Sequence, residues 1–212
     1  MSTADATSTT GRTLGRRGAE TRQRILDTLA AMIEAHGVRE IRLSEVTREV
    51  GVSPPAFYQY FKDLDEALLA LCEQVSEQAL EVRAALEPSW IDEAGTDAAR
   101  RFVDRFIGYW DDHRPVLWVR NVAAQDGDER FRSIRNRALE PISNELTRQI
   151  TLAQAAGHVD ASITPASLAI VLMSMVERIG MMYPGVGSMG SSRDELVHAV
   201  SYVFERAIVG PR

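Results

Sequence analysis

Residues 50–63 read VGVSPPAFYQYFKD, in which a double proline precedes four aromatic residues. Ser53 is a good residue to begin a helix, because its side-chain oxygen can accept a hydrogen bond from a first-turn N–H group. Pro54 and Pro55 lose little directly after it, since the first N–H groups of a helix have no partner within the helix. The double proline therefore predicts the start of a short helix.

A second short helix is expected just before this one. Ile41, Leu43, Val46 and Val50 have helical spacing, and Gly51 is suited to the tight turn that ends such a helix. Two short helices joined by a tight turn predict a helix-turn-helix, whose second helix lies in the major groove of DNA. A generic helical hairpin shares half of this pattern and is the alternative.

The apolar periodicity of the remaining chain predicts helices throughout, and no segment alternates as a strand does. The fold class is therefore all-α, with about nine helices. We expect them over residues 18–36, 41–50, from 54, 63–82, 102–113, 116–124, 127–156, 165–182 and 192–209. Pro115 is expected to stop a helix and Pro141 to kink or split one, because proline removes a hydrogen bond and clashes with the preceding turn.

Composition excludes several classes of protein. The chain has 212 residues, 45% hydrophobic and 25% charged, which is typical of a globular protein. One cysteine, Cys72, excludes a disulfide framework, and the four histidines lack metal-ligand spacing, so we expect no metal and no cofactor. Neither a signal peptide nor an apolar run of membrane-spanning length is recognisable. These features favour a cytoplasmic protein without a membrane partner.

The formal net charge of −6 conceals an uneven distribution: residues 1–62 carry a net +2 and residues 63–212 a net −8. An acidic protein can still bind nucleic acid when its positive charges lie on one face. Random scatter of charge explains these numbers about equally well.

The stretch GVSPPAFYQYFKDLDEAL resembles the signature of the TetR family of transcriptional regulators, and ETRQRILDTLAAMIEAHGVREIRLSEV is similar to the family's first helix and its entry into the second. Together they cover residues 20–71. The C-terminal part is loosely similar to mycobacterial ethionamide-resistance-type repressors. The resemblance implies a flexible arm (1–17), a three-helix DNA-binding domain (18–62) and a helical ligand-binding and dimerisation domain (63–212).

The resemblance also assigns roles around the helix-turn-helix. Phe57 and Phe61 would pack inward, while Tyr58 and Tyr60 would reach phosphates, which fix register without reading sequence. Gln59 alone is suited to a bidentate contact, which favours adenine. The expected DNA-binding residues are Arg42, Ser53, Pro54, Pro55, Ala56, Tyr58, Gln59, Tyr60 and Lys62.

Two positions depart from the family pattern. Leu64 stands where the family often has a lysine, and Lys62 is expected to substitute for it. Arg42 replaces the usual Ser or Thr cap of the second helix. An arginine cannot cap this end of a helix, but it can reach DNA or remain solvated.

Under the same resemblance, the C-terminal domain binds an effector and forms a homodimer. Aromatic and Met side chains would line an apolar pocket, with Asn121 and Glu177 as polar anchors. The expected pocket residues are Phe106, Tyr109, Trp110, Trp118, Asn121, Phe131, Met173, Glu177 and Tyr183. The expected dimer interface is Leu168, Leu172, Met175, Ile179, Leu196, Val200, Val203 and Ala207. Any one of these residues is also a candidate for the core.

Competing motifs carry little weight. Residues 185–190 match G-x-G-x-x-G but follow a helix, so a loop is favoured over a dinucleotide site. Adjacent Asp111, Asp112 and His113 point in different directions on a helix. No nucleophile elbow exists, and Cys72 is expected in the core, so no enzyme is predicted. A helical small-molecule-binding protein or enzyme with a non-functional helix-turn-helix, and a ligand-sequestering dimer, are the alternatives.

Overall fold

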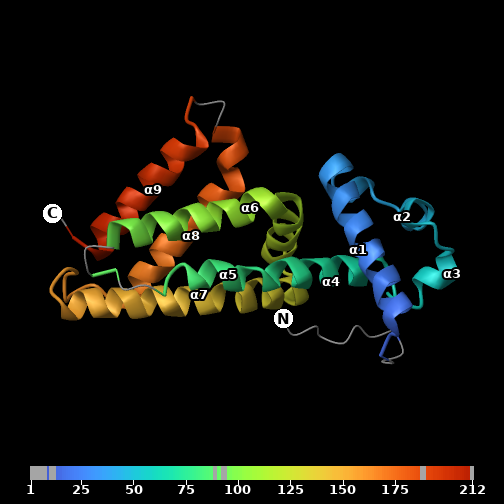
Figure 1. Cartoon of the computed structure of the whole chain (residues 1–212), viewed down its shortest axis with the longest axis horizontal. Helices are drawn as coiled ribbons and strands as arrows, with labels where there is room; N and C mark the ends of the chain where they lie inside the picture. Colours follow the sequence, from blue (N-terminus) through green and yellow to red (C-terminus); the bar gives the residue numbers. More distant parts are fainter. Residues whose placement is uncertain (1–8, 10–12, 88–89, 92–94, 187–189, 211–212) are drawn as a thin grey trace. The chain divides into compact units, whose positions relative to one another are not determined.

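The computed structural model describes residues 9, 13–87, 90–91, 95–186 and 190–210, and these form helices without any β-strand (Figure 1). The helices are α1 (Arg16–His36), η1 (Val38–Glu40), α2 (Leu43–Val50), α3 (Pro54–Phe57), α4 (Leu64–Glu77), α5 (Ala79–Ala84), α6 (Gly95–Gln125), α7 (Glu129–Ala155), α8 (Pro165–Val186) and α9 (Arg193–Ile208). The predicted all-α class is confirmed.

The chain forms two compact units. Unit 1 comprises residues 1–75 and 115–134, and unit 2 comprises residues 76–114 and 135–212. Helices α4, α6 and α7 each contribute to both. The predicted boundary at residue 62, between a DNA-binding domain and a ligand-binding domain, stays a prediction. The two compact units divide the chain at other positions.

Unit 1 is built on the buried face of α1, with Ile25 and Leu29 among its core residues. Phe57 and Phe61 are 0% and 1% exposed, and their ring centroids are 5.7 Å apart. The guanidinium of Arg22 lies 4.9 Å from the centroid of the Phe61 ring. The inward packing of both phenylalanines is confirmed.

Glycines end the first two helices, as expected. Gly37 follows α1 with φ +77°, and its N–H donates to the carbonyl of Ile33 at 2.9 Å. Gly51 follows α2 in the left-handed conformation, with φ +75° and ψ +34°. These positive φ values favour glycine, because a Cβ atom would clash with the backbone.

The predicted long helix over residues 63–82 is wrong in one respect, because it is two helices. Asp63 caps its start, and the Asp63 Oδ1 atom accepts from the N–H of Glu66 at 2.8 Å. However, α4 ends at Glu77 and α5 begins at Ala79. The break lies next to the boundary at residues 75–76, where the chain passes from unit 1 to unit 2.

Pro115 does not end a helix, so the prediction of two helices on either side of it is wrong. It lies inside the 31-residue helix α6, and Pro141 likewise lies inside α7 without splitting it. A proline removes only one hydrogen bond, and side chains buried on both sides, such as Trp110 and Leu117, hold α6 in helical form. Pro115 marks the boundary between the units instead.

Unit 2 has an aromatic core. The rings of Trp90, Phe102 and Phe204 are fully buried, with centroids 5.5 Å apart for Phe102 and Phe204 and 6.1 Å apart for Trp90 and Phe102. Buried Gln149 joins this core to the segment that follows α5, because its Nε2 donates to the carbonyl of Leu86 at 2.9 Å.

The start of α9 is fixed by polar contacts. Ser192 caps the helix, with its Oγ accepting from the N–H of Glu195 at 3.3 Å, as the sequence predicts. Arg193 then donates to the carboxylates of Asp104, at 2.7 Å, and Asp111, at 2.8 Å, both on α6. These ion pairs hold the start of α9 against α6.

Helix α8 is unusually apolar. Its segment from Pro165 to Tyr183 has a mean hydropathy of 1.4 and is long enough to cross a membrane by length and composition alone, although no such segment was predicted from the sequence. The core helix of a globular protein passes the same test. Only 33% of the segment is buried within the chain, so much of this apolar surface is available to a partner.

Candidate DNA interface and ligand cavity

The recognition element of the helix-turn-helix is α3, and its start follows the sequence prediction. The Oγ atom of Ser53 accepts from the N–H of Ala56 at 3.3 Å, and the two prolines occupy the first turn. The α-helix proper is short, and hydrogen-bonded turns continue it to Phe61, whose N–H donates to the carbonyl of Phe57 at 3.1 Å.

The structure places all nine predicted DNA-binding residues at the surface of unit 1, exposed or half-buried. They are Arg42, Ser53, Pro54, Pro55, Ala56, Tyr58, Gln59, Tyr60 and Lys62. Tyr58 is 49% exposed, with its ring edge-on to Phe57 at a centroid distance of 6.0 Å. Phe57 therefore supports the ring of Tyr58 from the core, and Tyr58 faces solvent.

Arg42 precedes α2 and makes no side-chain cap, as expected for an arginine at this end of a helix. Half of a capping box forms in its place, because Glu45 Oε2 accepts from the backbone N–H of Arg42 at 3.3 Å. The Arg42 guanidinium is thus left at the surface.

Sequence reasoning missed a contact from the N-terminal arm. The Thr9 N–H donates to the carbonyl of Gln59 at 3.2 Å, and Thr9 Oγ1 donates to the carbonyl of Tyr58 at 3.1 Å. One threonine in a Ser/Thr-rich stretch gives no signal for such a contact. Helix α1 also begins at Arg16, inside the predicted arm, while residues 1–8 and 10–12 of that arm lie outside the described residues.

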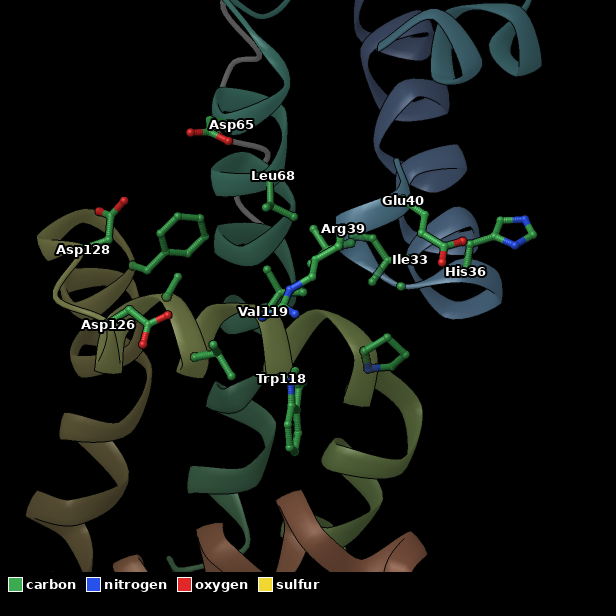
Figure 2. Close-up of a pocket in the computed structure, with 16 residues that line it drawn as sticks. Ile33, His36, Arg39, Glu40, Asp65, Leu68, Trp118, Val119, Asp126 and Asp128 are labelled. Atoms are coloured by element: carbon green, nitrogen blue, oxygen red, sulfur yellow. The ribbon is translucent and has the colours of Figure 1, made fainter. Parts of the chain in front are cut away.

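Unit 1 contains a cavity of about 870 Å³ (Figure 2). Its walls come from the end of α1, from η1, from α4, from α6 and from the start of α7. The lining residues are Ile33, His36, Gly37, Val38, Arg39, Glu40, Asp65, Leu68, Pro115, Trp118, Val119, Val122, Ala123, Asp126, Asp128 and Phe131. Since η1 leads directly into α2, one wall of the cavity adjoins the helix-turn-helix.

Apolar side chains dominate the walls, and charged groups lie among them. Trp118 is 44% exposed, which leaves part of its indole open to a bound molecule, whereas Phe131 is 4% exposed. Figure 2 shows the Arg39 side chain extending from η1 towards Val119.

An ion pair fixes the charge of one lining carboxylate. Arg130 donates to Asp128 through Nε, at 3.1 Å, and through Nη2, at 2.7 Å. These hydrogen bonds from Arg130 lower the pKa of Asp128 to about 2, so its carboxylate is ionised at neutral pH.

Two of the predicted pocket residues, Trp118 and Phe131, line this cavity, and seven do not. Asn121 belongs to unit 1, where its Oδ1 accepts from Arg120 Nε at 3.0 Å. The other six belong to unit 2: Phe106, Tyr109, Trp110, Met173, Glu177 and Tyr183.

The unit 2 residues among these predictions pack closely. Phe106 and Trp110 are 0% and 1% exposed. Glu177 forms a bidentate ion pair with Arg135 of α7, in which Arg135 Nε donates to Glu177 Oε1 at 3.0 Å. The polar anchor predicted at position 177 thus already has a cationic partner from its own chain.

Most of the cavity was not predictable from the sequence. Ile33, Arg39, Leu68 and Asp126 lie on four different elements, and no pattern along the chain relates them. The one local signal is the helix end at Gly37, after which the chain turns and exposes Arg39.

The predicted dimer stripe includes residues that serve as core. Leu172 and Val200 are 2% and 3% exposed, which leaves them little area for a partner, while Val203 is 41% exposed. The remaining predicted interface residues are half-buried: Leu168, Met175, Ile179, Leu196 and Ala207.

The exposed apolar face of α8 and α9 shares only Val203 with that stripe. We call it the α8–α9 face, and it comprises Ile170 (64% exposed), Val171 (62%), Met182 (42%), Tyr202 (53%) and Val203 (41%). Large apolar side chains that are exposed on two helices are typical of an interaction surface.

The structure also places several residues of the competing motifs. The described part of the chain contains no group of three His, Cys, Asp or Glu residues suited to a metal ion. The Asp111 carboxylate accepts hydrogen bonds from Arg114 and Arg193. Cys72 is 1% exposed, and burial raises its thiol pKa to about 12, so the thiol is protonated at neutral pH. Within the G-x-G-x-x-G segment, residues 187–189 lie outside the described residues.

The helix-turn-helix, with its exposed polar face on an all-helical chain, defines the class of DNA-binding transcriptional regulators. A family model for the bacterial regulatory proteins of the tetR family matches residues 25–71, and one for the tetracyclin repressor-like C-terminal domain matches residues 82–212. The chain belongs to the TetR family. Its members are transcriptional regulators, so the protein is not an enzyme.

Solved structures share this fold. One is a protein from Rhodococcus sp. RHA1, at 24% identity and a TM-score of 0.69, covering 89% of this chain and 95% of that one. A regulatory protein of the tetR family from Rhodococcus RHA1 has 19% identity and a TM-score of 0.70, covering 89% and 97%. The fatty acid degradation regulator FadR from Bacillus halodurans has 13% identity and a TM-score of 0.66, covering 91% and 96%.

At these identities the solved structures show the fold alone. No protein of curated function matches the sequence significantly. The finer likeness to ethionamide-resistance-type repressors stays a prediction.

Proposed function

We propose that the protein is a homodimeric, cytoplasmic repressor that a largely apolar small molecule releases from its operator. The main support for a response to an effector is the cavity of about 870 Å³, which lies in the same compact unit as the helix-turn-helix. Cavities of roughly 300–1,000 Å³ are the usual size for drug-sized ligands.

The α8–α9 face supports dimerisation. Its five side chains are each more than 40% exposed, although all are apolar or aromatic. Such a face on a lone chain promotes aggregation, and pairing with the same face of a second copy would bury it. A two-fold dimer also supplies two recognition elements, which is how helix-turn-helix regulators read paired half-sites.

The position of the cavity suggests how a ligand acts. Ile33, Arg39 and Glu40 line it from the segment that leads into α2, while Leu68 and Val119 line it from α4 and α6. A ligand touching both sides would favour the arrangement of these elements that it fits best. It shifts the protein between DNA-binding and released states only by its difference in affinity for the two.

Footprinting on DNA upstream of the protein's own gene tests the proposal. We expect protection of two half-sites with centres about 34–36 Å apart, as for two recognition elements in successive major grooves. Protection of only one half-site would contradict the dimeric mode of binding. Absence of any protected site would favour the alternative, a helical ligand-sequestering protein with a non-functional helix-turn-helix.

A further inference from the structure

We propose that the unit 1 cavity binds a small organic cation with an aromatic body. This inference deepens the proposed function, on which it rests for the view that the cavity holds the effector. It concerns the chemical class of the ligand and the residues that select it.

The walls suit an aromatic body. Ile33, Leu68, Val119 and Val122 provide aliphatic surface, and Trp118 and Phe131 provide rings. Trp118 is the more exposed of the two rings, at 44%. An indole face attracts cations more strongly than a phenyl or phenol face does, so it favours a positively charged ligand over a neutral one of the same shape.

The charges that line the cavity are mainly negative. Four carboxylates belong to Glu40, Asp65, Asp126 and Asp128, against one guanidinium, that of Arg39. Arg130 compensates Asp128 and lies 3.9 Å from a carboxylate oxygen of Asp65. A negative charge therefore remains in excess even when Arg130 is counted.

Two of these carboxylates have no side-chain partner of their own. In the part of the chain that the structure describes, the Asp126 carboxylate makes neither an ion pair nor a hydrogen bond, and the same holds for that of Glu40. A cationic ligand in the cavity would give the Asp126 carboxylate a partner. An anionic ligand would meet repulsion from every lining carboxylate.

Arg39 acts as the chain's own cation in this cavity. Its side chain extends from η1 towards Val119, as Figure 2 shows, with no ion pair to any described residue. The positive charge of the guanidinium repels a ligand cation in the same cavity, and the stem of the side chain fills space against the apolar wall. Removing this side chain should therefore strengthen the binding of a cation and weaken the binding of an anion.

A pair of isosteric ions tests the charge preference directly. Tetraphenylphosphonium and tetraphenylborate have the same shape and opposite charge. We expect isothermal titration calorimetry of the full chain, without DNA, to show phosphonium binding at least about tenfold tighter than borate binding. Equal affinity for both ions, or tighter binding of the borate, would overturn the proposal.

Substitutions locate the binding site. Asp126→Asn should weaken phosphonium binding about two- to fivefold, the range for a partly exposed ion pair. Trp118→Ala should weaken it about tenfold through loss of the ring. Arg39→Ala should strengthen it about two- to fivefold. Asp112→Asn, which removes an exposed carboxylate of α6 outside the cavity lining, is the matched control and should change nothing.

The outcomes separate this inference from the proposed function. If phosphonium binding is insensitive to Asp126→Asn, Trp118→Ala and Arg39→Ala, the ligand binds outside this cavity. That result overturns the inference, whether or not the protein binds its operator. Phosphonium binding with the expected sensitivities supports the inference even if a gel shift then shows no release from the operator, in which case the effector response in the proposed function fails.

Discussion

Gly180 of α8 lies directly against the indole of Trp110 in α6. A Cβ atom on Gly180 would come within 2.5 Å of Trp110 Cδ1 and 2.7 Å of Cγ, closer than carbon atoms approach without covalent bonding. The indole is 1% exposed and has little room to move. Glycine at position 180 is therefore what allows α6 and α8 to pack in unit 2.

Gly180→Ala should destabilise the protein by about 1–3 kcal/mol, because the added methyl group overpacks a filled core. Urea denaturation measures this change. Gly108→Ala is the matched control, since the nearest atom to its Cβ is Arg193 Nη2 at an ordinary 3.7 Å. Within helix α6, this control should be neutral or stabilising by up to about 1 kcal/mol. Equal effects of the two substitutions would contradict the packing argument.

Tyr58→Phe tests the phosphate contact expected of the exposed ring. The substitution removes a hydroxyl group and keeps the ring that packs on Phe57, so the fold should be unaffected. Affinity for operator and for random duplex should fall alike, by about two- to tenfold, because a phosphate contact carries no sequence information. Gel shifts with both duplexes measure this, and Tyr183→Phe, in unit 2, is the control. Undiminished binding to both would leave Tyr58 with a purely structural role.

Val171→Glu tests the α8–α9 face. Val171 is 62% exposed in the single chain, so a glutamate there is tolerated by the monomer. Within a dimer it would bury a charge, which costs several kcal/mol, and the protein should become monomeric at micromolar concentration. Light scattering gives the mass. Ile163→Glu, at a 41% exposed position before α8, is the control and should remain dimeric.

Most of the fold could be predicted because its signals are local. The cap at Ser53, the glycine at position 51 and the apolar stripe of α1 each act through neighbours in the sequence. The prediction of a helix end at Pro115 was wrong. Proline disfavours a helix interior because it removes one hydrogen bond, but the buried side chains before and after Pro115 stabilise α6 by more than that loss. The presence of the helices was therefore predictable from the sequence, whereas the ends of the long helices were not.

The candidate sites differ in the same way in how far they could be predicted from local sequence signals. The DNA-binding residues form one continuous motif, and the structure places all of them at the surface. The cavity, in contrast, gathers residues from Ile33 to Phe131, which are adjacent only after folding. The dimer stripe stays a prediction, and the sequence could not show that Leu172 is buried in the single chain while Ile170 is exposed, because both are apolar and only packing distinguishes them.

Arg130→Gln tests the ion pair beside the cavity. The hydrogen bonds of Arg130 hold the pKa of Asp128 at about 2, below its ordinary value of 3.8. A depressed acid pKa stabilises the folded state above pH 3.8, and this contribution disappears as the pH falls from 3.8 towards 2. We expect the substitution to raise the pKa of Asp128 towards 3.8 and to reduce the dependence of stability on pH in that window. NMR titration of the Asp128 carboxyl carbon measures the pKa, and no change would show that Arg130 does not act on it.

Trp110→Ala and Trp118→Ala, compared side by side, separate core from ligand surface. Trp110 is 1% exposed against Gly180, so its loss should cost about 3–5 kcal/mol of stability. Trp118 is 44% exposed in the cavity wall, so its loss should leave a folded protein with operator affinity kept and ligand-induced release weakened. Denaturation curves and a DNA-release titration on both variants provide the two readouts. A stable Trp110→Ala protein with altered release would move the effector into unit 2, as the sequence first suggested. Release unchanged in Trp118→Ala would remove Trp118 from the effector site.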